Sequence, residues 1–189
     1  MPRAGLTIDV VVREAARIID DRGAEGLSLS AVAESLGVRV PSLYKHVDGM
    51  PALRRGAMLL AKTGLAAALS DAAIGRSRDQ ALTAISIAYR KWALEHPGLY
   101  PLSVSAPVNG DEDDIAASST LVETVFRVLA GYGLEGDDAV DATRFLRAAL
   151  HGYVALETSG GFAMPVDLER SFLRLIASVE AALDSWTKS

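Results

Sequence analysis

The sequence predicts an all-α fold, in which an N-terminal three-helix head is followed by a larger helical bundle. Apolar residues recur every three or four positions through most of the 189 residues, which is the spacing of one helix face. No stretch favours a strand, and the chain holds no repeat. The third observation is a pair of short helical patterns around a glycine within residues 27–47, which is typical of a helix-turn-helix.

The first expected helix runs from a cap at Thr7 to about Arg22, and Gly23 and Gly26 follow its end, where glycine is favoured. This helix would brace the two that follow. Its buried face is expected to hold Ile8, Val11, Val12, Ala15, Ile18 and Ile19.

The helix-turn-helix pattern begins at Ser28, whose hydroxyl can accept a hydrogen bond from an amide one turn later. Gly37 stands where the chain must turn sharply, and Pro41 stands in the first turn of the second helix, where its missing N–H costs nothing. This second helix, residues 40–47, is expected to keep Leu43 and Val47 inward. Its outward side chains are polar, aromatic and cationic, which suits a DNA groove: Ser42, Tyr44, Lys45 and His46.

These residues resemble the DNA-binding motif of the TetR/AcrR family of bacterial transcriptional regulators, most specifically in the run Leu-Tyr-Lys-His-Val that ends at Val47. The resemblance covers about residues 7–58. It implies a homodimeric repressor that binds a palindromic double-stranded DNA operator and is released from it by a small-molecule effector. It also implies that the helix beginning near Pro51 links the head to the body.

Nine residues are expected to contact DNA through phosphates, base edges or base methyl groups: Ser28, Ser30, Arg39, Val40, Pro41, Ser42, Tyr44, Lys45 and His46. Most members of the family carry a lysine at the position of Met50, where it meets the DNA backbone. Met50 cannot make that contact. Either Arg54 or Arg55 replaces it, or the affinity for DNA is lower.

The composition limits the classes of protein to which this chain can belong. The net charge is −5, yet residues 1–55 carry eight Lys and Arg against seven Asp and Glu, so the acidity lies in the rest of the chain. A mildly basic head on an acidic body fits DNA binding with modest non-specific affinity.

No apolar run reaches the roughly 18 residues of a membrane span, and no secretory leader is evident, so we expect a cytoplasmic protein. The absence of cysteine excludes disulfides and thiol chemistry.

Beyond the head, long helices are expected over residues 51–73, 77–96, 115–132, 137–158 and 166–186. A short apolar segment at 99–102 and an acidic loop at 107–114 separate two of them. The expected domains are a helix-turn-helix DNA-binding domain over residues 1–50 and a helical ligand-binding and dimerisation domain over residues 51–189.

The last two helices carry more apolar surface than one small bundle needs, so we expect them to pair with their copies in a dimer. The alternative is that they complete the core of one chain. The expected interface residues are Leu146, Tyr153, Phe172, Leu175, Val179 and Leu183. Other residues are expected either to line an effector pocket or to form plain core: Tyr89, Trp92, Tyr100, Phe126, Phe145 and His151.

No cofactor or metal is expected, because the three histidines lack ligand spacing and the acidic run at Asp111–Asp114 lacks the pattern of a calcium loop. That run is expected to be a solvated helix start. His96 is expected at a helix end, and His151 either faces a ligand or lies in the core. An enzyme would need a nucleophile–base pair or a metal cluster, and none is evident. The remaining alternative to a regulator is an interaction protein whose head binds another protein.

Overall fold

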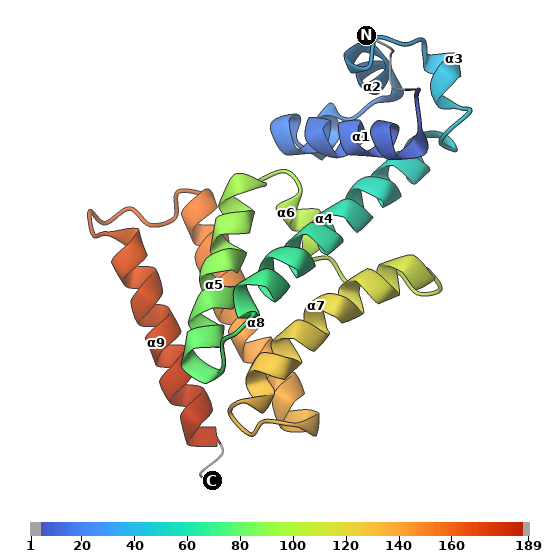
Figure 1. Cartoon of the computed structure of the whole chain (residues 1–189). Helices are drawn as coiled ribbons and strands as arrows, with labels where there is room; N and C mark the ends of the chain where they lie inside the picture. Colours follow the sequence, from blue (N-terminus) through green and yellow to red (C-terminus); the bar gives the residue numbers. More distant parts are fainter. Residues whose placement is uncertain (1–4, 187–189) are drawn as a thin grey trace. The chain divides into compact units, whose positions relative to one another are not determined.

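The computed structural model describes residues 5–186, and every regular element in this range is a helix, which confirms the predicted all-α fold (Figure 1). The chain divides into two compact units, Met1–Gly64 with His96–Ile115, and Leu65–Glu95 with Ala116–Ser189. Two helices, α4 (Gly49–Ala73) and α7 (Glu112–Ala130), pass from one unit into the other. The boundary after residue 50, between a DNA-binding domain and a ligand-binding and dimerisation domain, stays a prediction. Among the described helices, none has the length and apolar character needed to span a membrane.

The head consists of α1 (Ile8–Arg22), the 3-10 turn η1 (Ala24–Gly26), α2 (Leu29–Ser35) and α3 (Val40–Leu43). Thr7 caps α1 as predicted, since its hydroxyl oxygen accepts from the Val10 amide at 3.3 Å. The apolar stripes of the three helices meet in one core: Val11, Ala15, Ile18, Ile19, Val32, Ala33, Leu43 and Val47. Ile8 was expected in this core but is 59% exposed, because it stands in the first turn of α1.

The first unit is completed by the first half of α4 and by the segment around α6 (Tyr100–Ser103). Helix α4 packs tightly on α1, because a Cβ on Gly56 would lie 2.7 Å from Val12 Cγ1. The α5–α6 turn is bonded to α1 through Asp20. One oxygen of Asp20 accepts from the amides of Gly98 and Leu99 at 3.1 and 3.3 Å.

In the second unit, α5 (Arg78–Glu95) packs against α8 (Gly136–Thr158) and α9 (Leu168–Trp186). Their shared core holds Leu82, Ile85, Leu146, Leu150, Val154, Phe172, Ile176, Val179 and Leu183. Arg90 ties the three helices together, donating to Glu157 at 2.7 and 2.6 Å and pairing with Glu169. The five predicted long helices all exist, each with ends within three residues of the prediction, and α6 forms at the short apolar segment.

Candidate nucleic-acid interface

The turn between α2 and α3 is fixed by backbone hydrogen bonds that require Gly37. Its φ of 64° lies in the left-handed region, which glycine adopts at little cost. The Gly37 amide donates to Glu34 O at 3.0 Å, and the Val38 amide donates to Ala33 O at 2.9 Å. This pair of bonds is the Schellman ending of a helix. It sets the angle at which the chain enters α3.

Helix α3 is shorter than the predicted 40–47, since the α-helix covers only Val40–Leu43 and the chain continues as a turn. The His46 and Val47 amides both donate to Leu43 O, at 2.8 and 3.0 Å, so residues 44–47 stay tightly wound. Gly49, with φ 75°, then begins α4 in a new direction.

Buried residues at both ends of the segment 43–47 flank residues that are exposed or half-buried. Leu43 is fully buried and Val47 is 4% exposed, while Tyr44 between them is 57% exposed and Lys45 is also exposed. A large aromatic side chain held out from a rigid base is available for contact with another molecule. None of the nine residues predicted to contact DNA is buried: Ser28, Ser30, Arg39, Pro41, Tyr44 and Lys45 are exposed, and Val40, Ser42 and His46 are half-buried.

Ser28 caps α2 as predicted, because its oxygen accepts from the Ala31 amide at 3.0 Å. The hydroxyl hydrogen of the same side chain is still available to a phosphate. Helices α1 and α2 are joined by Glu14, which accepts from Arg17 at 2.6 Å and from the Ser35 hydroxyl. Hydrogen bonding from Arg17 lowers the pKa of Glu14 below its usual value.

Arg55 is held within the protein. Its Nε and Nη2 donate to the two oxygens of Asp111 at 2.6 Å each, and Nη2 also donates to Asp113 at 2.7 Å. Its neighbour Arg54 is exposed. Of the two arginines considered as substitutes for a lysine at Met50, Arg55 therefore has its guanidinium occupied by carboxylates.

Lys62 and Asp114 form a buried ion pair, with side chains 2% and 0% exposed. Burial alone would raise the pKa of Asp114, but hydrogen bonds from Lys62 and the Val108 amide outweigh it and lower that pKa. The expectation of a solvated acidic run is wrong for Asp114. A signal was present in the sequence, because Lys62 stands on the apolar face of α4 between Ala61 and Leu65. Within the described residues no group of three or more acidic or histidine side chains could hold a metal ion.

The residues named for an effector pocket divide into two groups. Tyr89, Trp92 and Tyr100 are buried and Phe126 is half-buried. Phe145 is 37% exposed and lies 5.7 Å from the ring of Trp186, and His151 is exposed on α8. His151 is therefore not a core histidine. His96 follows the end of α5 as expected, with Nδ1 2.6 Å from an oxygen of Asp20.

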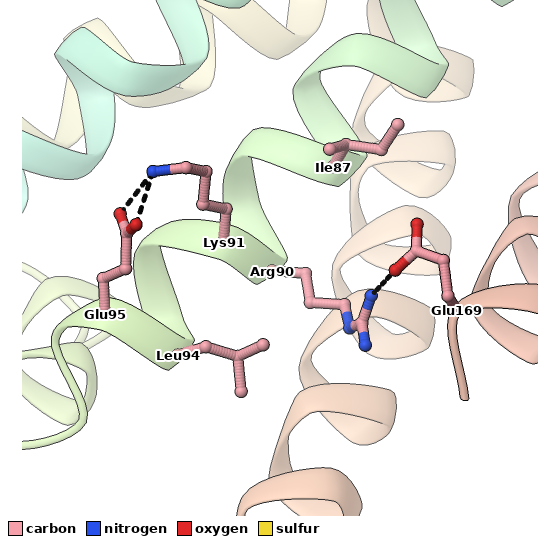
Figure 2. Close-up of a pocket in the computed structure, with 6 residues that line it drawn as sticks. All are labelled: Ile87, Arg90, Lys91, Leu94, Glu95 and Glu169. Atoms are coloured by element: carbon pink, nitrogen blue, oxygen red, sulfur yellow. Dashed lines mark hydrogen bonds and ion pairs between the residues drawn. The ribbon is translucent and has the colours of Figure 1, made fainter. Parts of the chain in front are cut away.

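A surface pocket of about 340 Å³ lies elsewhere, along α5 and the start of α9 (Figure 2). Its cations are already paired, since Lys91 donates to Glu95 at 2.5 and 2.6 Å and Arg90 pairs with Glu157 and Glu169. It is thus a poor site for an anion. The lining residues include none of those named from the sequence: Ile87, Arg90, Lys91, Leu94, Glu95 and Glu169.

Most of the residues expected at a dimer interface lie in the chain's own core. Leu146, Phe172, Val179 and Leu183 are at most 3% exposed. Tyr153 and Leu175 are half-buried, and the Tyr153 hydroxyl donates to Leu168 O at 2.6 Å. A side chain that the monomer buries has little surface left for a second copy.

Two sequence families match the chain. "Bacterial regulatory proteins, tetR family" matches residues 11–57, and "Tetracyclin repressor-like, C-terminal domain" matches residues 82–179. The uncharacterized HTH-type transcriptional regulator Rv0681 of Mycobacterium tuberculosis is 33% identical over 97% of this chain and 84% of its own.

Solved structures of other proteins share the fold. A protein of unknown function from Rhodococcus sp. RHA1 aligns with a TM-score of 0.82 at 22% identity, covering 97% of this chain and 99% of its own. The TetR family protein ActR from Streptomyces coelicolor, in complex with actinorhodin, aligns with a TM-score of 0.67 at 18% identity, covering 95% and 96%.

Proposed function

This chain belongs to the TetR family of bacterial helix-turn-helix transcriptional regulators, and from that premise we propose that it is a ligand-responsive repressor. As a homodimer it binds a palindromic operator, and a small-molecule effector releases it. DNA binding, dimerisation and effector binding are each supported by a different part of the molecule.

The observation that carries DNA binding is the rigid, outward presentation of Tyr44 and Lys45 between the buried Leu43 and Val47. The start of α3, from Arg39 to Ser42, enters the major groove and contacts base edges. Tyr44, Lys45 and His46 contact phosphates or base methyl groups, and Ser28 and Ser30 donate to the backbone from the start of α2.

Dimerisation is supported by apolar and small residues that α8 and α9 leave outside the core. On α8 they follow one another at positions 145, 148, 152 and 156, a spacing of three and four residues that keeps them on one face. Leu156 is 49% exposed, and a Cβ on Gly152 would meet nothing within 4 Å. We place the two-fold interface on this face, together with the half-buried Leu175 and Ala182 of α9.

Effector binding is supported by the buried aromatic residues Tyr89 and Trp92 of α5, the kind of apolar side chain that lines ligand pockets. A relative of the same fold, ActR, has been solved with actinorhodin bound. The effector acts by population shift, since it binds better to the dimer conformation whose heads do not fit successive major grooves. Helix α4, which leaves the head at Gly49, carries that movement.

Selection of random duplex DNA on the purified protein at about 50 and 200 mM salt tests this function. We expect a palindrome with half-sites one helical turn, about 34–36 Å, apart. Its affinity should fall about 10³-fold between the two salts if six or more phosphates are contacted. Failure of any sequence to enrich, with both native and refolded protein, would contradict DNA binding and favour a protein partner for the head. Refolding removes an effector that co-purifies.

A further inference from the structure

The acidic run that begins α7 is joined at two points to the part of α4 that lies in the same compact unit. At the outer point, one guanidinium, that of Arg55, bridges two carboxylates, Asp111 and Asp113. Both Asp111 oxygens accept from Arg55, which is the bidentate geometry that gives strong, directional ion pairs. Asp111 also accepts from the Asp114 amide at 3.1 Å, so it caps α7 while it holds α4.

The inner point is the buried pair of Lys62 and Asp114. Asp114 accepts in addition from the Val108 amide at 2.9 Å, which fixes the preceding loop to the same carboxylate. Removing one partner of a buried pair leaves an uncompensated charge in the core, so this contact holds firmly. The outer contact is different, because Arg55 is 44% exposed and its ion pairs are open to water and salt.

Arg55 and Lys62 are seven residues apart, or two helical turns, and so lie on one face of α4. A single contact would leave α4 free to rotate relative to α7, whereas two contacts along the axis of α4 define the angle between these two helices. The five pairing residues and the helix-turn-helix all belong to one compact unit.

We propose that the Arg55–Asp111–Asp113 and Lys62–Asp114 contacts, called here the α4–α7 clasp, are a positioning device that sets the angle of α4 and thereby the spacing of the two heads on DNA. The inner pair is the fixed pivot, and the outer pair restricts the swing. This inference rests on the proposed DNA-binding function. Arg55 and its two carboxylates are positioning residues that act through α4 and do not touch the operator.

Half-site spacing is the readout that separates positioning from a general loss of structure. Each base pair added between half-sites moves them apart by about 3.4 Å and rotates one by about 35°. A dimer whose heads are held at one angle should reject operators that are one base pair too long or too short. A dimer with an open outer contact should tolerate them.

The experiment measures the affinity of the full-length chain for the selected palindrome and for versions with one or two base pairs inserted or removed at its centre. The variants are Arg55→Gln and the pair Asp111→Asn with Asp113→Asn. Glu112→Gln is the control, because Glu112 belongs to the same run and is exposed outside the clasp. Thermal melts establish that each variant is folded. Lys62 and Asp114 are left unchanged, because their replacement endangers the core.

We expect the wild type and the control to prefer the natural spacing by about tenfold or more over a one-base-pair change. Both clasp variants should reduce that preference to about twofold, with unchanged affinity for a single half-site. Preference retained by both variants would overturn the clasp and leave DNA binding intact. If the wild-type protein selects no operator, both the DNA-binding function and the clasp are overturned.

Opposite behaviour of the two variants would also overturn the clasp. If Arg55 contacted a phosphate, Arg55→Gln would weaken every operator and reduce the salt dependence, whereas removing Asp111 and Asp113 charges would strengthen binding. The clasp predicts the same relaxed spacing from both.

Discussion

The carboxylate of Asp20 in α1 accepts a hydrogen bond from the amide of Gly98, 78 residues later in the chain, at 3.1 Å. The backbone at Gly98 lies so close to α1 that a Cβ there would stand 2.0 Å from the carbonyl oxygen of Ile19. The turn after α5 is thus joined directly to the helix that braces the helix-turn-helix. This contact is independent of the covalent path through α4.

Replacing Gly98 with alanine should destabilise the protein, because the added methyl group meets backbone atoms that cannot move aside as a flexible side chain could. We expect a loss of about 1–3 kcal/mol in the free energy of unfolding, measured by urea titration. Gly5→Ala is the control, since a Cβ at Gly5 meets nothing within 4 Å. Equal stability of both variants would show that the turn is not pressed against α1.

Lys62→Met should be among the most damaging single changes in the chain, because it leaves Asp114 buried without its cation. Breaking a buried ion pair in this way costs about 3–5 kcal/mol. The double variant Lys62→Met with Asp114→Asn should recover most of that loss, since asparagine still accepts from the Val108 amide. Chemical unfolding of both variants checks this, and additive losses would contradict the coupling.

Acid should weaken the outer half of the clasp. Hydrogen bonds from Arg55 lower the pKa of Asp111 from 3.8 to about 2 in the folded protein. Since the folded pKa is the lower one, Asp111 contributes stability above about pH 4 and loses it as the pH falls towards 2.

The comparison that checks this is between the wild type and Asp111→Asn, which removes the charge and keeps a helix-capping side chain. The difference between the urea concentrations at which the two proteins are half unfolded should have its full value at pH 6 and vanish near pH 2. A difference that stays constant across this range would mean that the charge of Asp111 contributes nothing.

Tyr44→Ala should reduce operator affinity by about tenfold while the free energy of unfolding changes by less than about 0.5 kcal/mol, because the ring is exposed. Leu43→Ala, one residue earlier, removes a fully buried side chain and should cost about 2–5 kcal/mol of stability. Fluorescence anisotropy with labelled operator and thermal melts give the two quantities. Unfolding of the Tyr44 variant would place that ring in the core.

Charged residues on the proposed interface should separate the dimer. Leu156→Asp, combined with Leu175→Asp, places two carboxylates in each half of an apolar two-fold contact. We expect sedimentation to report half the wild-type mass. Leu173→Asp is the control, since Leu173 is an exposed leucine of α9 outside the assigned face. A wild-type mass for the double variant would place the interface elsewhere.

The course of the helices could be predicted because their ends are decided by neighbouring residues. Thr7 and Ser28 cap helices by reaching only three residues ahead, and Gly37 and Pro41 act through their own backbones. The extent of α3 was overestimated, because the apolar spacing of Leu43 and Val47 fits a wound turn as well as a helix.

The direction of side chains on α8 could not be predicted in the same way. Phe145 and Leu146 are adjacent and both apolar, yet the first is exposed and the second is core. A helix that is apolar on more than one side does not show in its sequence which side meets the other helices.

Ion pairs between residues that are far apart in the chain could not be predicted from the sequence either. Asp111 and Asp114 find Arg55 and Lys62 more than fifty residues earlier in the chain. Local charge patterning explained the acidic run adequately as the start of a helix, and only the fold brings the cations to it.

The grouping of His96–Ile115 with the helix-turn-helix bears on how such proteins could be recombined. Exchange of residues 1–50 alone between two relatives would pair an α1 from one protein with a Gly98 turn from another. The grafted head would then meet a foreign turn at Ile19 and Asp20. A transplant that keeps these contacts would have to carry two separate stretches of the gene, because the compact unit that holds the DNA-binding head is discontinuous in sequence.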